Sequence, residues 1–343
     1  MRAILFHLTG TEKLSYDQPL LRWIPMFYKK ILCLLFLSLS LANFSQASLV
    51  LIDGKWSDEK YIPTLPVSEH YDSGVNLIAE EKWEEALIHF LVITSHFTSS
   101  AFYADALYYS GVCYYHLRDL DIANKQLSSY LNLGGNLRFF ENVFEYKYAI
   151  ASKYSQGAKK HFLGSKQMPR MVPARSSALE LYDEVVASMP NREIAAKALY
   201  GKAVLLRKKR EYKESIECLQ TLTRRFVRSS LAADAFLLIS EIYLDQSSIE
   251  AQDPDLLGLA QINLSKFQKG FPGDERIVKG HENLFKMKEI FSRSLFQTGR
   301  FYEKKKKFHA SYVYYMEVVK HYPETSFAEK SRARLAALQD KQN

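Results

Sequence analysis

Apolar residues along most of this chain recur at helical spacing, in short runs that come in pairs. The stretch from Tyr103 to Leu131, YADALYYSGVCYYHLRDLDIANKQLSSYL, shows this best: one run of small and aromatic residues, a polar break, then a second amphipathic run. Residues three or four apart share a face of a helix, so the pattern predicts a helical hairpin. Similar pairs recur about six times between Tyr71 and Pro323.

These pairs follow the tetratricopeptide pattern, which has a period of about 34 residues. The pattern requires a small residue in each helix where the two helices of a hairpin cross closely. The second helices supply it at Ala86, Ala123, Ala178, Ser215, Ala260 and Ser311. The first helices supply it, twelve positions earlier, at Gly74, Gly111, Ala203 and Gly299. The third and fifth pairs therefore match only in their second helices.

A single hairpin cannot bury its apolar face alone, whereas stacked hairpins bury one another's faces. We therefore expect an all-α fold: a tetratricopeptide-repeat helical-hairpin solenoid of about five to six repeats with a C-terminal capping helix. The solenoid should cover residues 67–343, with repeats at 67–98, 102–135, 139–190, 193–227, 231–272 and 275–323 and the capping helix at 325–339.

Two segments of the solenoid differ from the simple hairpin pattern. Residues 164–176, GSKQMPRMVPARS, contain two prolines and are longer than a usual helical connection, which predicts a long loop. The segment from Glu275 to Lys307 is long enough that we expect two helices before the last hairpin turn.

The N-terminal part of the chain shows no repeat pattern. Residues 1–25 have no sustained period and are expected to be a non-native or unstructured extension. Residues 48–66 contain Pro63 and Pro66 and are expected to be an extended segment that leads into the first repeat helix.

Residues 26–47 have the layout of a secretory signal peptide. Lys29 and Lys30 precede the apolar run ILCLLFLSLSL, and a site with small residues ends at Ala47. We expect the chain to be exported and cleaved after Ala47. The alternative is a transmembrane anchor, although the apolar run is shorter than the roughly 20 residues that a bilayer span needs.

The cysteines predict no disulfide. Cys33 lies in the apolar run, while Cys113 and Cys218 lie in different repeats and on apolar helical faces. We expect the Cα atoms of Cys113 and Cys218 to lie further apart than the roughly 7 Å that a disulfide allows. They are expected to be buried free thiols.

Residues that could carry chemistry do not form a recognisable set. No metalloprotease, dinucleotide, phosphate-loop or nucleophile-elbow motif occurs. Cys113 and His116 lie three apart on one helix, but two ligands do not make a zinc site. We therefore expect no catalytic, metal-binding or cofactor-binding residue, and no enzyme.

The formal charge of +8 is spread along the chain and includes two short basic runs, 207–210 and 304–307. Each run falls at a predicted hairpin turn, where solvated charges are the ordinary interpretation. The alternative is a patch for an acidic partner or for lipid head groups. A nucleic-acid partner would need such patches interleaved with exposed aromatics on one face, and the export signal argues against such a partner.

The first helix of each hairpin should face the concave side of the solenoid. Aromatic and arginine side chains on such a surface are typical of protein-binding sites. The residues predicted to line this groove are Tyr71, Val75, Tyr108, Val112, Tyr115, His116, Tyr200, Arg207, Phe296 and Arg300. The alternative for each tyrosine is ordinary packing between helices.

Three stretches resemble the BamD family, the helical-repeat component of the outer-membrane β-barrel assembly machinery. They are residues 81–131, which begin EKWEEALIHF; FEYKYAIASKY with ALELYDEVVASMPN; and residues 267–338, with FQKGFPGD, GRFYEKKKKF and YYMEVVKHYPETSFAEKSRARLAAL. The sequence departs from this family in two ways. The family is lipid-anchored whereas no lipobox is visible here, and residues 192–250 resemble additional repeat material.

The resemblance implies a non-enzymatic adaptor in the periplasm, peripherally associated with the outer membrane. Its N-terminal repeats, 71–131, would bind extended segments of unfolded barrel substrates, and its C-terminal repeats, 275–338, would dock other subunits of the assembly machinery. The alternative is a periplasmic repeat protein that coordinates cell-wall synthesis or division with the envelope.

Overall fold

The computed structural model describes residues 49–52, 55–58, 62–249, 253 and 255–339. The expected N-terminal extension, signal peptide and cleavage site at Ala47 lie outside these residues. The chain divides into two compact units, residues 1–64 and 65–343. In the first unit, strands β1 (Leu49–Ile52) and β2 (Lys55–Asp58) pair antiparallel, with Leu49 opposite Asp58.

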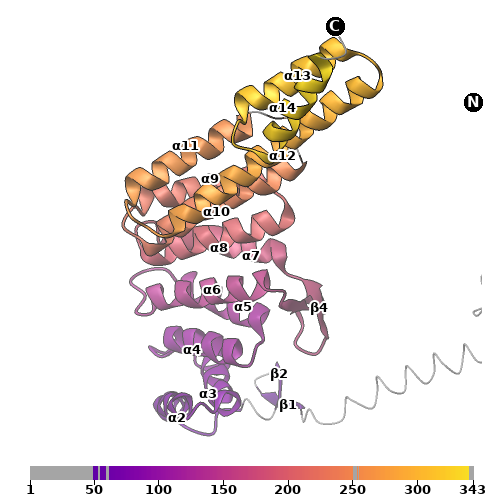
Figure 1. The fold of residues 1–343 in the computed structure, drawn as a ribbon. Coiled ribbons are helices and arrows are strands. Elements are labelled where there is room, and N and C mark those ends of the chain that lie inside the picture. Colours follow the sequence, from indigo (N-terminus) through magenta and orange to yellow (C-terminus); the bar gives the residue numbers. More distant parts are fainter. Residues whose placement is uncertain (1–48, 53–54, 59–61, 250–252, 254, 340–343) are drawn as a thin grey trace, which may run out of the picture. The chain divides into compact units, whose positions relative to one another are not determined.

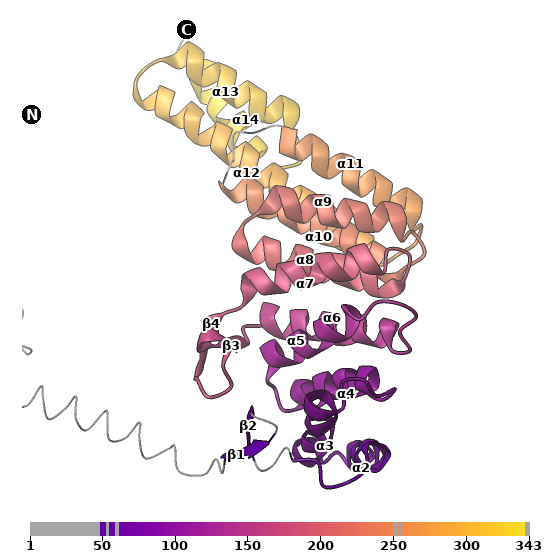
Figure 2. The same ribbon diagram turned by 180° about the vertical axis from the view of Figure 1, so that it is seen from behind.

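The second unit is helical, which confirms the predicted all-α repeat fold (Figures 1 and 2). Its helices are α2 (Val67–Ala79), α3 (Trp83–His96), α4 (Tyr103–His116), α5 (Leu120–Leu131), α6 (Phe140–Ser155), α7 (Arg175–Ser188), α8 (Glu193–Lys209), α9 (Tyr212–Arg225), α10 (Ser230–Ile249), α11 (Asp255–Gly270), α12 (Arg276–Lys304), α13 (Phe308–His321) and α14 (Ser326–Gln339).

The helices form two layers. The first helices of successive hairpins, α4, α6, α8, α10 and α12, contact one another in that order. Each second helix packs on its own first helix, and α3, α7, α9 and α11 also pack on the first helix of the next hairpin. The last helix, α14, packs on α12 and α13 and buries Ala328, Leu335 and Leu338. It therefore covers the apolar end of the stack, as a capping helix does.

The predicted close helix crossings are present. A Cβ atom added to Gly74 would lie 2.7 Å from Cζ of Phe90, and one added to Gly299 would lie 2.8 Å from Cε1 of Tyr315. Both glycines are buried inside their helices. They are needed because the facing aromatic ring occupies the space of a side chain.

The same turn joins the helices of four hairpins. The second-last residue before the next helix has a positive φ: 58° at Glu81, 65° at Arg118, 65° at Arg210 and 58° at Lys306. At Arg210 the backbone N–H donates to the carbonyl of Arg207, and the N–H of Glu211 donates to that of Leu206. This is a Schellman-type helix end, in which glycine is the favoured residue. The four hairpins are those that match the repeat pattern in both helices.

We expect Arg210→Gly to be about 1 kcal/mol more stable than Arg210→Ala, because only glycine relieves the left-handed backbone. Both substitutions remove the same exposed side chain, so the comparison isolates the backbone. Urea unfolding followed by far-ultraviolet circular dichroism measures the difference. Equal stabilities would show that the turn is not strained.

Two local predictions are wrong. The segment 275–307 forms one helix, the 29-residue α12, and not two. It contains no proline, and Gly280 does not break it because this glycine faces Leu264 of α11, where a Cβ would lie 2.8 Å from Cδ1.

The segment expected to be a long loop belongs largely to a β-hairpin. Strands β3 (Lys159–His161) and β4 (Arg170–Pro173) pair antiparallel, and a short 3₁₀ turn, η2 (Phe162–Gly164), lies between them. The hairpin is fixed to α5: His161 Nδ1 lies 2.7 Å from Asp121 Oδ1, and Arg170 pairs with the buried Asp119. These long-range contacts explain why a local pattern did not reveal it.

Candidate functional site

The ten residues predicted to line the groove all lie on first helices, but they differ in exposure. His116 and Arg300 are exposed, and Tyr71, Val75, Tyr115, Tyr200 and Arg207 are half-buried. Tyr108, Val112 and Phe296 are only 7%, 5% and 8% exposed.

The groove role predicted for Tyr108, Val112 and Phe296 is therefore corrected. The ring of Tyr108 stacks on Phe139, with centroids 4.2 Å apart, and Phe139 precedes the next first helix. Phe296 packs between Tyr315 of α13 and Phe327 of α14. The next hairpin covers Tyr108, and the second helix of its own hairpin and the capping helix cover Phe296, so these residues belong to the core.

An aromatic surface remains where the C-terminal end of α4 meets α6 and the beginning of α3. We define the aromatic face as Trp83, Tyr115, His116, Tyr146 and Lys153. The imidazole of His116 stacks on Trp83 with centroids 3.8 Å apart, and Tyr115 meets Tyr146 edge to face at 5.1 Å. Lys153 Nζ lies 4.5 Å from the centroid of Tyr115, a cation–π contact.

The electrostatics of this face favour a neutral His116. Partial burial of the ring and the charge of Lys153 lower the pKa of His116. Burial raises the pKa of the Tyr146 hydroxyl, which therefore stays protonated. The face thus presents flat rings, hydrogen-bonding groups and one cation, a combination that binds polypeptide backbone and apolar side chains.

Tyr71 lies further toward the N-terminal end and is tied to α4. Its hydroxyl donates to Asp105 Oδ2 at 3.2 Å, and its ring packs on Phe102 with centroids 4.7 Å apart. Burial, followed by the charge of Asp105, raises the pKa of Tyr71. Arg138 Nη1 lies 3.6 Å from the same carboxylate. Tyr71 therefore serves mainly to join two hairpins.

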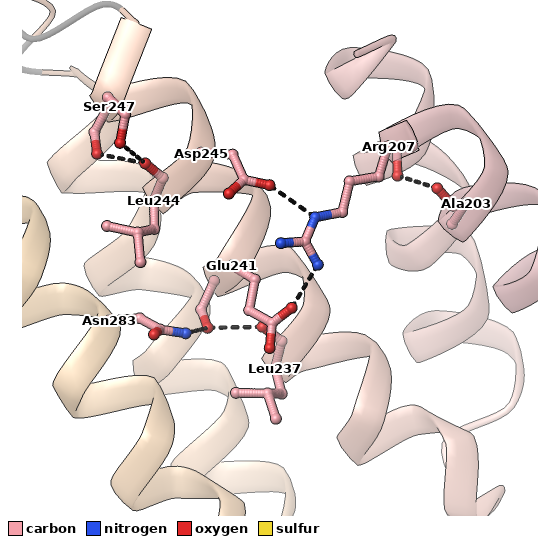
Figure 3. A network of polar contacts seen from close by, with 11 residues as sticks. Ala203, Arg207, Leu237, Glu241, Leu244, Asp245, Ser247 and Asn283 are labelled. Atoms are coloured by element: carbon pink, nitrogen blue, oxygen red, sulfur yellow. Dashed lines mark hydrogen bonds and ion pairs between the residues drawn. The ribbon is translucent and has the colours of Figure 1, made fainter. Parts of the chain in front are cut away.

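Ion pairs occupy the first helices in the middle of the stack. Arg207 on α8 donates from Nε to Asp245 Oδ2 at 2.8 Å and from Nη1 to Glu241 Oε2 at 2.5 Å (Figure 3). Both carboxylates lie on α10. The charge of Arg207, which was predicted to bind a ligand, is thus already neutralised within the solenoid. Arg300, by contrast, makes no ion pair with any residue that the structure describes.

Sequence reasoning missed Tyr146 and Lys153. The third hairpin matches the repeat pattern only in its second helix, so no residue of its first helix was assigned to the groove. The two residues lie seven apart, which is two helical turns, and therefore share one face of α6. Extending the helical period through this segment would have found both.

A histidine pair joins α2 to α3. Nδ1 of the buried His70 lies 2.9 Å from Nδ1 of the half-buried His89. Because the Leu65 N–H donates to Nε2 of His70, the proton of His70 is on Nδ1 and is donated to His89. Burial, followed by the charge of His89, lowers the pKa of His70, and burial lowers that of His89.

We expect acid to destabilise the first hairpin through this pair. In the unfolded chain histidine is protonated near pH 6.5, whereas in the folded chain His70 and His89 are protonated only at lower pH, because their pKa values are lowered. The folded chain therefore loses stability as the pH falls below about 6.5. In melts at pH 7.5 and 5, the loss in Tm should be smaller for His89→Gln than for the unaltered chain. His309→Gln, at an exposed position, is the control and should change nothing.

The other candidates for chemistry have structural roles. Cys113 is a buried free thiol, and burial raises its pKa to about 12, so it is not a reactive thiolate at neutral pH. Cys218 is also free but only half-buried, which corrects the expectation that both are buried. Among the described residues, no group of three or more His, Cys, Asp or Glu side chains is placed to hold a metal ion. Nor does any described helix have the length and apolar composition of a membrane span.

The comparison with protein families agrees with the repeat pattern in one stretch of the chain. Residues 105–133 match the tetratricopeptide repeat family. No curated protein sequence matches the chain. Similar solved structures include MamA (41-end) from Desulfovibrio magneticus RS-1, at 16% identity and a TM-score of 0.37, over 61% of this chain and 97% of that one. Another is a tetratricopeptide repeat protein from Parabacteroides merdae ATCC 43184, at 12% identity and a TM-score of 0.37, over 80% and 98%.

Proposed function

We propose that this chain is a non-enzymatic adaptor that holds an extended polypeptide segment on its aromatic face. The repeat fold makes a protein–protein scaffold of the chain. The choice of site rests on one observation: partly exposed rings on α4 and α6 lie beside Lys153. Rigid aromatic side chains supply contact area at low entropic cost, which is why they dominate protein-binding surfaces.

We further propose that the adaptor acts in the periplasm and assists assembly of outer-membrane β-barrel proteins. The support is the leader-like segment before Ala47 and the resemblance of 81–131 and 267–338 to the BamD family. In this proposal the aromatic face, which overlaps the first of these stretches, binds unfolded barrel segments. The C-terminal hairpin α12–α13 and the capping helix dock the other assembly subunits at the outer membrane.

The test is photo-cross-linking in cells that express the full chain. A benzoylphenylalanine at His116 should form adducts with polypeptides, whereas the same group at Glu217, exposed on a second helix, should not. Mass spectrometry then identifies the adducts. Outer-membrane barrel proteins would support the assembly role, and cell-wall synthases or division proteins in their place would overturn it in favour of cell-wall coordination. Absence of any adduct at position 116 would overturn peptide capture itself.

A further inference from the structure

The β3–β4 hairpin projects from the side of the helix stack, beyond the ends of the neighbouring helices (Figures 1 and 2). Its surface is unusual for a connection between two helices, because it exposes large apolar side chains. Phe162, Met168 and Met171 are 44%, 42% and 54% exposed. Pro169 and Pro173 on the same hairpin are exposed as well.

The charged residues of the hairpin segment itself have one sign. The sequence from residue 146 to residue 179 contains no Asp or Glu. The cations that it contributes on or beside the hairpin are Lys153, Lys159, Lys160, Lys166, Arg170 and Arg175. Lys166 and Arg170 pair with Asp119 of the helix stack. Lys159, Lys160 and Arg175 form no ion pair with any residue that the structure describes.

A pocket at the foot of the hairpin extends the positive region. It has a volume of about 370 Å³, and its cationic lining residues are Arg118, Lys153, Lys159 and Arg170. Asp119 and Asp121 of the helix stack pair with Arg170, Lys166 and His161, and they leave Lys159 and Lys160 without a counter-ion among the described residues. The exposed face of this region therefore combines apolar side chains with uncompensated positive charge.

We propose that the β3–β4 hairpin docks the protein on an anionic lipid bilayer. Apolar side chains of a projecting loop can enter the boundary between head groups and acyl chains while the surrounding cations meet the anionic head groups. The charge favours this occupant over a neutral or basic protein surface. Lysines and prolines beside an unpaired strand edge can be explained by protection of that edge against pairing with another chain. Such protection does not explain the exposed Phe162, Met168 and Met171.

Vesicle binding of the full chain tests this proposal. We expect sedimentation with vesicles of phosphatidylcholine containing about 30% phosphatidylglycerol, weaker binding at high salt and none to phosphatidylcholine alone. The variant Phe162→Ser/Met168→Ser/Met171→Ser should lose about tenfold or more in affinity. Because these side chains are exposed, its Tm should remain that of the unaltered chain.

The chain provides a matched control. Phe301, Val313 and Met316 are exposed to similar extents on α12 and α13, and Lys305 Nζ lies 6.0 Å from the ring centroid of Phe301. Phe301→Ser/Val313→Ser/Met316→Ser should bind the vesicles as the unaltered chain does. Loss of binding in this variant, full binding in the hairpin variant, or no binding by the unaltered chain would each overturn the proposal. Peptide capture at the aromatic face is measured separately, so its failure would be distinguishable.

Discussion

Glu184→Ala is expected to lower the free energy of unfolding by about 3 kcal/mol, because it leaves a buried positive charge without its counter-ion. Lys147 of α6 is fully buried, and its ammonium lies 2.8 Å from a carboxylate oxygen of Glu184 on α7. The other two acceptors are Asn124 Oδ1 at 3.1 Å and Ser128 Oγ at 2.8 Å, both on α5. One lysine thus holds together helices of two successive hairpins.

Lys147→Met should cost far less than Glu184→Ala, about 1 kcal/mol or below, although it removes the same ion pair. The methionine fills the buried space without a charge. Glu184, which loses its partner, is 39% exposed and can be hydrated. Urea unfolding of both variants measures the contrast. The reverse order, or equal losses, would show that the buried charge does not govern the stability of this junction.

Tyr108→Ala is expected to destabilise the chain by about 3 kcal/mol or more, because it removes a buried ring and leaves a cavity. The ring contacts Phe139, Tyr109 and Tyr130. Tyr115 lies two helical turns further along the same face of α4. Tyr115→Ala should cost less, since its ring is half-buried. It should instead weaken peptide binding, about tenfold, through loss of an aromatic contact.

Thermal melts and peptide titrations of the two variants separate these roles. If Tyr108→Ala keeps the Tm of the unaltered chain, the assignment of Tyr108 to the core is wrong. If Tyr115→Ala lowers the Tm as strongly as Tyr108→Ala does, Tyr115 belongs to the core as well.

The sequence predicts the hairpins because their crossings depend on local spacing. Gly74 and Gly299 lie twelve positions before the small residues of their second helices, and the structure places both against an aromatic ring. This register is a property of one hairpin and is therefore visible in a single stretch of chain. The β3–β4 hairpin, by contrast, is held by contacts of His161 with Asp121, 40 residues earlier, and of Arg170 with Asp119, 51 residues earlier, which no local pattern contains.

The groove was only partly predictable for a related reason. Tyr108 and Tyr115 lie seven apart, so helical spacing assigns them to the same face of α4. Only the neighbouring hairpin distinguishes them, because Phe139 covers Tyr108 and leaves Tyr115 partly exposed. Arg207 shows the same limit, since its partners Glu241 and Asp245 lie more than thirty residues away on α10.

The most direct test of peptide capture is equilibrium binding of fluorescent peptides, tiled over the sequence of an unfolded outer-membrane barrel protein, to the unaltered chain and to Tyr115→Ala/His116→Ala. The control is Glu217→Ala, which changes an exposed residue on a second helix, outside the predicted groove. We predict that some peptides bind the unaltered chain and the control equally, and bind the double variant at least about tenfold more weakly at unchanged helicity. Equal binding by all three proteins would contradict the account.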